Sequence, residues 1–143
     1  MFLLNDIMIK KYMSDGSLSI TNFFPKNLYS NFYYFRLYRC VGMWDEKTKK
    51  YHYSKIEEPK KESLLIPSGQ YLLVKSFERF YLSTKVLGYF SQNSDLVEKG
   101  IKLNHSMSID PTFDSRLTLG LQNLTEHDVT LSVGENIGKV MFF

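Results

Sequence analysis

The C-terminal third of the chain contains several titratable side chains suited to acid–base or metal chemistry, among them His105, Asp110, Glu126 and His127. No cysteine, aspartate or second histidine stands at metal-ligand spacing from His105, so the sequence predicts no zinc site there. Asp110 precedes Pro111, which is typical of a turn whose carboxylate accepts hydrogen bonds from its own backbone. Glu126 and His127 fall in a polar break between two apolar runs, where we expect a structural role. Residue types and spacing alone therefore define no catalytic site.

The elements that position these side chains are apolar runs with a period of two. Leu117, Leu119 and Leu121 alternate with polar or small residues, as in a half-buried strand. The alternation resumes from Val129 to Val133, and a final apolar strand runs from Ile137 to Phe143. We therefore expect three successive strands joined by two turns, which together make a compact β unit.

The earlier part of the chain predicts one short helix followed by strands. Asn5 can cap a helix that runs to Met13 and is stopped at Asp15-Gly16. Strands are expected at Ser17–Ile20, Phe32–Val41, Leu64–Ile66, Gln70–Lys75, a further run ending at Leu82, and Val86–Phe90. The charged residues 44–62 follow no clear period and are expected to form a variable loop or hairpin.

Length and composition indicate one ordinary domain that spans residues 1–143. Apolar residues make up 43% and charged residues 23%, values typical of a soluble globular protein. The single cysteine, Cys40, excludes an internal disulfide, and we expect it to be buried. No apolar run reaches the ~18 residues of a membrane span, and Met1–Leu4 is too short for a signal peptide, so we expect a cytoplasmic protein. The formal charge of +3 comes from scattered Lys and Arg that are best read as solvated loops; a small anionic ligand is a weaker alternative, and nucleic acid is weaker still.

Several motifs become specific in combination. The turn Ile109-Asp110-Pro111, the strand with the pattern Leu-x-Leu-x-Leu-x-Asn ending at Asn123, and the Gly-x-x-Ile-x-x-x-x-Phe ending at Phe142 follow one another. Residues 4–20, LNDIMIKKYMSDGSLSI, add a helix, an Asp-Gly break and a Leu-Ser-Ile strand. In this order the motifs resemble the dCTP deaminase and trimeric dUTPase superfamily, and the N-terminal helix is similar to its deaminase branch. The resemblance implies an all-β, dUTPase-like (β-clip) fold, a distorted barrel or jelly-roll-like domain with a short N-terminal helix. It also implies a homotrimer with sites between neighbouring copies.

The resemblance further implies where substrate contacts would lie, and several of those positions are changed. An Arg-Ser-Ser triplet that opens a short helix in the family is Asn93-Ser94-Asp95 here, and a second family arginine is Glu98. The family triplet holds a triphosphate with backbone N–H groups, hydroxyls and a guanidinium. A carboxylate at that place disfavours the usual triphosphate pose because like charges repel. The family glutamate that moves protons during deamination is Gly120.

Other matched positions leave more than one role open. Asp110 matches the position of the aspartate with which a dUTPase activates water. Two other roles for Asp110 are equally weighted: contact with a sugar hydroxyl of a ligand, or formation of the turn alone. Tyr34 replaces an acidic residue that would help to hold magnesium, and we expect no C-terminal arm after Phe143. Phe113 matches an aromatic residue near the base or sugar, with core packing as the alternative. Lys139 replaces a phosphate-facing glutamine, where a cation could restore anion attraction.

Fold and function are therefore predicted separately. The first hypothesis is a catalytically degenerate trimer that binds a (deoxy)nucleotide between subunits as a sensor, sequestering protein or regulator. Its predicted nucleotide-binding residues are Asn93, Ser94, Asp95, His105, Asp110, Phe113 and Lys139. The second is an active dCTP deaminase or dUTPase with a rebuilt site, in which Asp110 and His105 would be catalytic with help from Lys139 and Glu78. The third is a structural or protein-interaction trimer without a nucleotide. We expect no cofactor, apart from Mg²⁺ if a triphosphate is bound, and no membrane or nucleic-acid partner.

Overall fold

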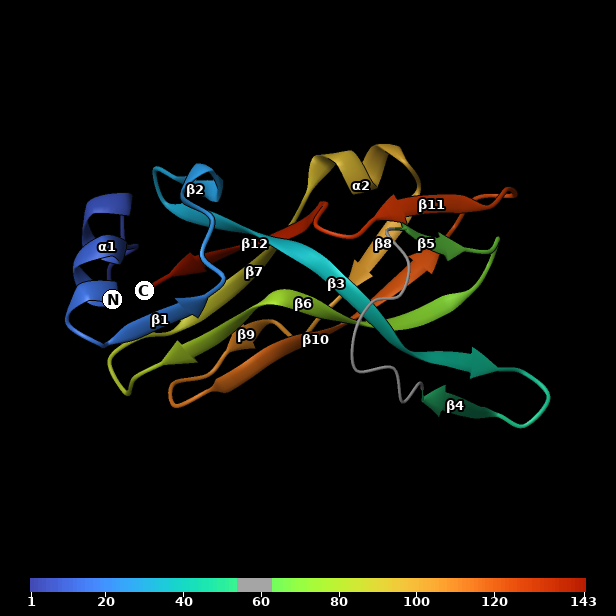
Figure 1. The fold of residues 1–143 in the computed structure, drawn as a ribbon, viewed down its shortest axis with the longest axis horizontal. Coiled ribbons are helices and arrows are strands. Elements are labelled where there is room, and N and C mark those ends of the chain that lie inside the picture. Colours follow the sequence, from blue (N-terminus) through green and yellow to red (C-terminus); the bar gives the residue numbers. More distant parts are fainter. Residues whose placement is uncertain (54–62) are drawn as a thin grey trace.

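Two long strands, β3 (Phe32–Asp45) and β6 (Tyr71–Leu82), cross the centre of the molecule (Figure 1). The computed structural model describes residues 1–53 and 63–143. The other elements are α1 (Asp6–Ser14), β1 (Leu18–Thr21), the 3-10 helix η1 (Pro25–Asn27), β2 (Leu28–Tyr29), β4 (Lys50–Tyr53), β5 (Ser63–Ile66), β7 (Gly88–Gln92), α2 (Ser94–Glu98), β8 (Ile101–Asn104), β9 (Ser108–Ile109), β10 (Asp114–Asn123), β11 (Val129–Ser132) and β12 (Asn136–Phe142). The main sheet has the order β8-β10-β6-β3-β12-β7-β9, with β1, β2 and β4 paired to the long strands, and β11 pairs with β5.

The main sheet curls until its two ends meet. β8 and β9 stand at opposite ends of the strand order, yet only residues 105–107 join them. A connection of that length spans at most roughly 15 Å, so the two edges lie close together and the sheet forms a half-barrel around the core. The predicted all-β, dUTPase-like class with a short N-terminal helix is confirmed. We call residues 104–109, where the edges meet, the seam; His105 lies in it and Asp110 follows it.

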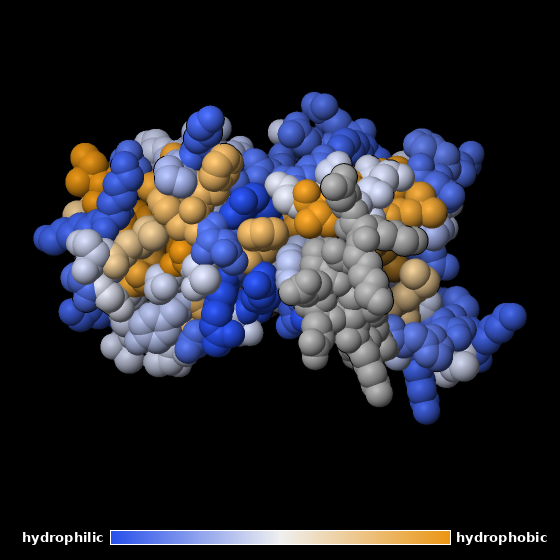
Figure 2. All heavy atoms as spheres, viewed as in Figure 1, coloured by the Kyte–Doolittle hydropathy of each residue, from blue (hydrophilic) through white to orange (hydrophobic). Residues whose placement is uncertain are grey.

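Alternation along the strands separates the core from the surface. In β3, Tyr33, Phe35 and Leu37 are fully buried, whereas Phe32 and Tyr34 are half-buried on the other face of the strand. The core thus takes up Tyr33 and Phe35, whereas Phe32 and Tyr34 lie on the outer face of β3. On the face shown in Figure 2, hydrophobic residues gather on both sides of a hydrophilic band that crosses β3 and β6.

The helix α1 follows the prediction closely. The Asn5 side chain accepts a hydrogen bond from the Met8 N–H at 2.9 Å, and the helix ends before Gly16, which has a φ of +83°. Ile9 is fully buried, so this short helix packs one apolar residue into the core. None of the helices in the described part of the chain has the length and hydropathy needed to cross a membrane.

The prediction that the three C-terminal strands form a compact unit of their own is wrong. β10 pairs with β6 and β8, β11 with β5, and β12 with β3 and β7, so none of the three pairs with another and they form no separate unit. A period of two predicts a strand but carries no information on its partner. The strands expected on either side of Ser76 are also one strand, β6, because the buried Ser76 hydroxyl donates to the Glu78 carbonyl and accepts from the Leu117 N–H.

Two further expectations are modified. Residues 46–49 form the turn of a hairpin between β3 and β4, whereas residues 54–62 of the expected loop or hairpin lie outside the described part of the chain. Cys40 is half-buried rather than buried, and the burial raises the pKa of its thiol.

A fully buried carboxylate ties β3 to β6. Glu78 Oε1 accepts from the Tyr33 hydroxyl at 3.0 Å and from Arg36 Nε at 2.7 Å, and Oε2 accepts from the Arg36 backbone N–H at 2.9 Å. Both carboxylate oxygens are therefore bonded within the core, and Glu78 is 0% exposed. A role for Glu78 in a rebuilt active site is wrong, because no ligand can reach it.

Burial and the neighbouring Glu78 raise the pKa of Tyr33 above its usual value of about 10. From about pH 10 upward, an unfolded chain loses a phenol proton that the folded chain keeps, so ionisation favours unfolding. The free energy of unfolding should therefore fall as the pH rises through this range, and Tyr33→Phe should remove this part of the fall. Urea unfolding of both proteins between about pH 8 and about pH 11 measures the difference. Parallel curves for the two proteins would contradict the assignment.

Candidate functional site

A hollow with a volume of about 350 Å³ opens beside the seam; we call it the seam hollow. Its lining includes Ser106, Ser108, Asp110, Phe113, Arg116 and Thr118. The exposed Asp110 carboxylate accepts a hydrogen bond from the Ser108 hydroxyl at 3.0 Å, a side-chain contact instead of the backbone contact expected for a plain turn residue. A carboxylate has about four acceptor positions, so Asp110 can still accept from a hydroxyl group of a ligand.

Aromatic rings border the seam hollow. Phe90 lines it and stacks on the His105 ring, with centroids 4.9 Å apart and an interplanar angle of 27°. His105 Nδ1 lies 2.6 Å from the Ser106 carbonyl oxygen, which can only accept, so Nδ1 carries a proton and Nε2 is the acceptor of the neutral ring. Phe113 packs against the core, which was the alternative role, and it also lines the hollow.

A fixed positive charge stands at the edge of the hollow. Arg116 lies where the pairing of β10 with β6 shifts register, between Arg116 and Thr118. Its Nη1 donates to the carbonyl oxygens of Ser76 and Phe77 at 3.0 and 2.5 Å, and its guanidinium lies 4.2 Å from the Tyr38 ring centroid. A guanidinium held in this way favours an anionic ligand nearby. Sequence reasoning missed Arg116, because its contacts with β6 and its place in the hollow lining depend on strand pairing, which leaves no local pattern.

The predicted residues 93–95 lie at the start of α2 and do not line the seam hollow. Asn93 is the N-cap: its Oδ1 accepts from the Asp95 N–H at 3.1 Å, and its Nδ2 donates to the Asn136 carbonyl at 2.8 Å. Ser94 and Asp95 are exposed. One N–H group that could have met a phosphate is thus already bonded, and the Asp95 carboxylate adds negative charge to the first turn.

Lys139 stands apart from the seam hollow as well. It pairs with Tyr34 and Ser91 on the neighbouring strands, and its Nζ lies 4.7 Å from the centroid of the Phe32 ring. Because Val140, the next residue along β12, is fully buried, Lys139 points to the outer face. Within one chain the predicted nucleotide-binding residues therefore form three groups: one at the seam, one at α2 and one at Lys139.

The space beside Gly120 is filled. A β-carbon at this position would collide with the hydroxyl group of Tyr71. The Tyr71 oxygen accepts a hydrogen bond from Asn104 Nδ2 at 2.8 Å, and its ring centroid lies 6.2 Å from that of Tyr51. The sequence identified Gly120 but not Tyr71, because their meeting depends on the register of β6 with β10, in which Tyr71 pairs with Gln122.

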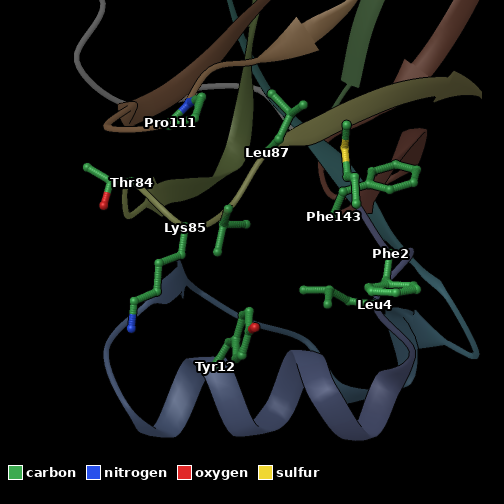
Figure 3. Close-up of a pocket in the computed structure, with 10 residues that line it drawn as sticks. Phe2, Leu4, Tyr12, Thr84, Lys85, Leu87, Pro111 and Phe143 are labelled. Atoms are coloured by element: carbon green, nitrogen blue, oxygen red, sulfur yellow. The ribbon is translucent and has the colours of Figure 1, made fainter.

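A separate hollow of about 310 Å³ lies between α1 and the C-terminal strand (Figure 3), and Pro111, the neighbour of Asp110, is among the residues that line it. Tyr12 of α1 faces it from one side, and Phe2 and Phe143 lie across from Lys85. None of the predicted site residues lines it. In the described residues, no group of three or more His, Cys, Asp or Glu side chains is arranged to hold a metal ion at either hollow. We assign no chemistry to this second hollow.

Comparison with known proteins agrees with the fold. A family model described as dCTP deaminase-like matches residues 3–143. The chain belongs to the dCTP deaminase-like family. The family predicted from the Ile109-Asp110-Pro111 turn and the strands around it is thereby confirmed.

Relatives in the dCTP deaminase-like family share between about a quarter and a third of the aligned residues. The dCTP deaminase of Pyrococcus horikoshii is 33% identical over 87 residues, which is 61% of this chain and 55% of that protein. The dUMP-forming dCTP deaminase of Corynebacterium diphtheriae is 32% identical over 92 residues, 63% of this chain and 49% of that protein. The chain thus spans about half the length of these relatives. A dUMP-forming dCTP deaminase of Corynebacterium efficiens is 26% identical over 152 residues, 99% of this chain and 78% of that protein.

Solved structures of the same fold extend the comparison. The crystal structure of 2'-deoxycytidine 5'-triphosphate deaminase from Agrobacterium tumefaciens matches with a TM-score of 0.77 at 12% identity, over 98% of this chain and 48% of that one. The native EIAV dUTPase matches with a TM-score of 0.50 at 11% identity, over 75% of this chain and 86% of that one. At these identities the likeness establishes the dCTP deaminase and dUTPase fold.

Asn93 offers a direct test of the structural role that replaces the family triplet. Asn93→Ala should lower the free energy of unfolding by about 1–2 kcal/mol, because it removes the cap of α2 and the bond to Asn136. Ser94→Ala, at the exposed neighbouring position, is the matched control and should change stability by less than about 0.5 kcal/mol. Urea unfolding measures both. Equal and small effects would mean that the Asn93 contacts contribute little to the fold.

Proposed function

We propose that this member of the dCTP deaminase-like family binds a (deoxy)nucleotide without deaminating it. The proposal rests on the residue at position 120 and on the side chain next to it. By resemblance this position holds the proton-moving glutamate, but here it is glycine, and the Tyr71 hydroxyl fills the space next to it. Glycine has no group that can move a proton, so this site lacks the residue that would act as acid and base in deamination.

The seam hollow supports nucleotide binding. Asp110 offers an acceptor for a sugar hydroxyl, Phe113 offers a ring face for a base or sugar, and Arg116 offers positive charge. These groups do not depend on Gly120, so binding can be retained where turnover is lost.

We propose that the complete site lies between copies in a homotrimer. Residues 93–95 and Lys139 stand outside the seam hollow of their own chain, and a neighbouring copy could bring such residues to it. Tyr29, Phe32 and Tyr34 pack against one another with ring centroids 5.2–5.5 Å apart, and Tyr29 is 50% exposed. An aromatic cluster of this kind, half-buried and half-exposed, is typical of a subunit interface. The trimer would act as a cytoplasmic sensor, sequestering protein or regulator in nucleotide metabolism.

Calorimetric titration with dCTP, dUTP, dTTP and their monophosphates, with product analysis of the same samples, tests the proposal. Binding without turnover supports it. Turnover would instead favour an active enzyme that uses Asp110 and His105. No binding across the panel would leave a structural or protein-interaction trimer. Light scattering on the same protein checks the trimer, and a monomer at micromolar concentration would contradict the inter-subunit site.

A further inference from the structure

Three cations from three neighbouring strands meet beside the seam hollow; we call Arg39, Lys75 and Arg116 the basic cluster. Arg39 of β3 pairs with Lys75 of β6, and Lys75 pairs in turn with Thr118 of β10. Arg116 reaches from β10 to β6, where it donates to the two carbonyl oxygens that follow Lys75. The guanidinium carbons of Arg39 and Arg116 lie 5.3 and 4.2 Å from the centroid of one ring, that of Tyr38. Because the residues next to them along the strands are buried, Lys75 and Arg116 both point to the outer face of the sheet.

Lys75 and Arg116 keep N–H donors that no described residue uses. Lys75 Nζ donates to Thr118 Oγ1 at 2.5 Å, and an ammonium group has further N–H groups to give. Arg116 spends only Nη1 on its two carbonyl oxygens, so Nε and Nη2 remain for another acceptor. Arg116 and Thr118 both line the seam hollow, so the unused donors of the guanidinium and of the ammonium bonded to Thr118 lie at the edge of this hollow.

No carboxylate among the described residues neutralises Lys75 or Arg116. Neither residue takes part in an ion pair there, and Asp114, the acidic residue nearest to Arg116 in sequence, pairs with Arg79 instead. Partial burial, followed by the charges of Arg39 and Arg116, lowers the pKa of Lys75 below its usual value. Like charges at this range repel, and an anion bound between them would replace the repulsion by attraction.

We propose that the basic cluster binds a phosphoryl anion at the edge of the seam hollow, within a single chain. Phosphate oxygens accept from the planar N–H groups of an arginine and from the compact charge of a lysine. The site is distinct from the start of α2, where Asp95 adds negative charge and which lines no part of the hollow. Its extension to the phosphates of a nucleotide rests on the proposed function, whereas the anion site itself does not.

Calorimetry with pyrophosphate on the native protein and on Lys75→Gln tests the inference. The native protein should bind pyrophosphate, and Lys75→Gln should bind it about tenfold more weakly, the effect of one charge-assisted hydrogen bond. Lys75→Arg keeps the charge and should stay within about threefold of the native affinity. Lys102→Gln removes an exposed lysine from β8, outside the hollow lining, so it is the matched control for net charge and should bind as the native protein does.

The anion site is overturned if the native protein does not bind pyrophosphate, if Lys75→Gln keeps the native affinity, or if Lys102→Gln loses as much affinity as Lys75→Gln. Pyrophosphate has no base or sugar, so these results do not depend on the proposed function. Thermal unfolding of each variant confirms that it is folded.

Titration with dUTP and with deoxyuridine identifies the source of the phosphoryl group. A nucleotide is the source if Lys75→Gln weakens dUTP binding and leaves deoxyuridine binding unchanged. If pyrophosphate binds and no nucleotide does, the source is free phosphate: the proposed function fails and the anion site stands. If dUTP binds equally well to the native protein and to Lys75→Gln, the proposed function stands and the extension to nucleotide phosphates is overturned.

Discussion

Glu78→Gln should lower the free energy of unfolding by at least about 3 kcal/mol, because it leaves a buried arginine contact without its countercharge. Glu78 is fully buried, and the side chain of its partner Arg36 is 16% exposed. The same carboxylate also accepts from the Tyr33 hydroxyl and from the Arg36 N–H, so three bonds between β3 and β6 weaken together. Urea unfolding at neutral pH measures the loss.

Two controls separate the buried pair from the loss of a charge in general. Glu98→Gln removes a carboxylate from the exposed surface of α2 and should change stability by less than about 0.5 kcal/mol. The double variant Glu78→Gln with Arg36→Met should lose less than the sum of the two single variants, because each single change leaves the other charge unpaired. A Glu78→Gln protein within about 1 kcal/mol of the native protein would show that the pair is dispensable.

The sequence predicted the parts of the fold that depend on neighbouring residues. The cap at Asn5, the leucine alternation in β10 and the break at Gly16 are all local, and each lies where it was expected. Pairing between strands is not local. Ser76 joins two expected strands into β6 through bonds to Leu117 and to the Glu78 carbonyl, and no short pattern reveals such contacts.

The candidate site follows the same division. Asp110 and Phe113 are close in sequence, and the structure brings them together in one hollow. Arg116 and Tyr71 were missed, because the contacts of both side chains depend on the pairing of β6 with β10. Lys139 was grouped with them by resemblance alone, and the period of β12 puts its side chain on the outer face instead. Only assembly with another copy could join these groups.

Gly120→Glu should yield a protein that does not deaminate dCTP and that is less stable by about 1–3 kcal/mol. The new side chain must displace the Tyr71 hydroxyl and break its bond with Asn104. Adding Tyr71→Ala to Gly120→Glu removes the side chain that occupies the space and should restore part of the lost stability. If the loss came only from the new negative charge at position 120, removal of Tyr71 would restore none of it. Urea unfolding compares the two variants, and ammonia release with nucleotide analysis measures deamination.

The double variant should also fail to deaminate dCTP, because a carboxylate supplies only one part of the chemistry. By resemblance, Asn93 and Glu98 stand in place of two arginines of the family; Asp95 adds a negative charge, and Asn93 already bonds the Asp95 N–H in the first turn of α2. A triphosphate would therefore lack the contacts that hold the base at position 120 in a reactive pose. Rapid deamination by either variant would show that the missing arginines are not needed. If the double variant binds nucleotide but still does not deaminate it, the changes at the start of α2 and at position 120 of β10 both contribute to the loss of activity. Restoring the enzyme would then require changes in α2 as well as in β10.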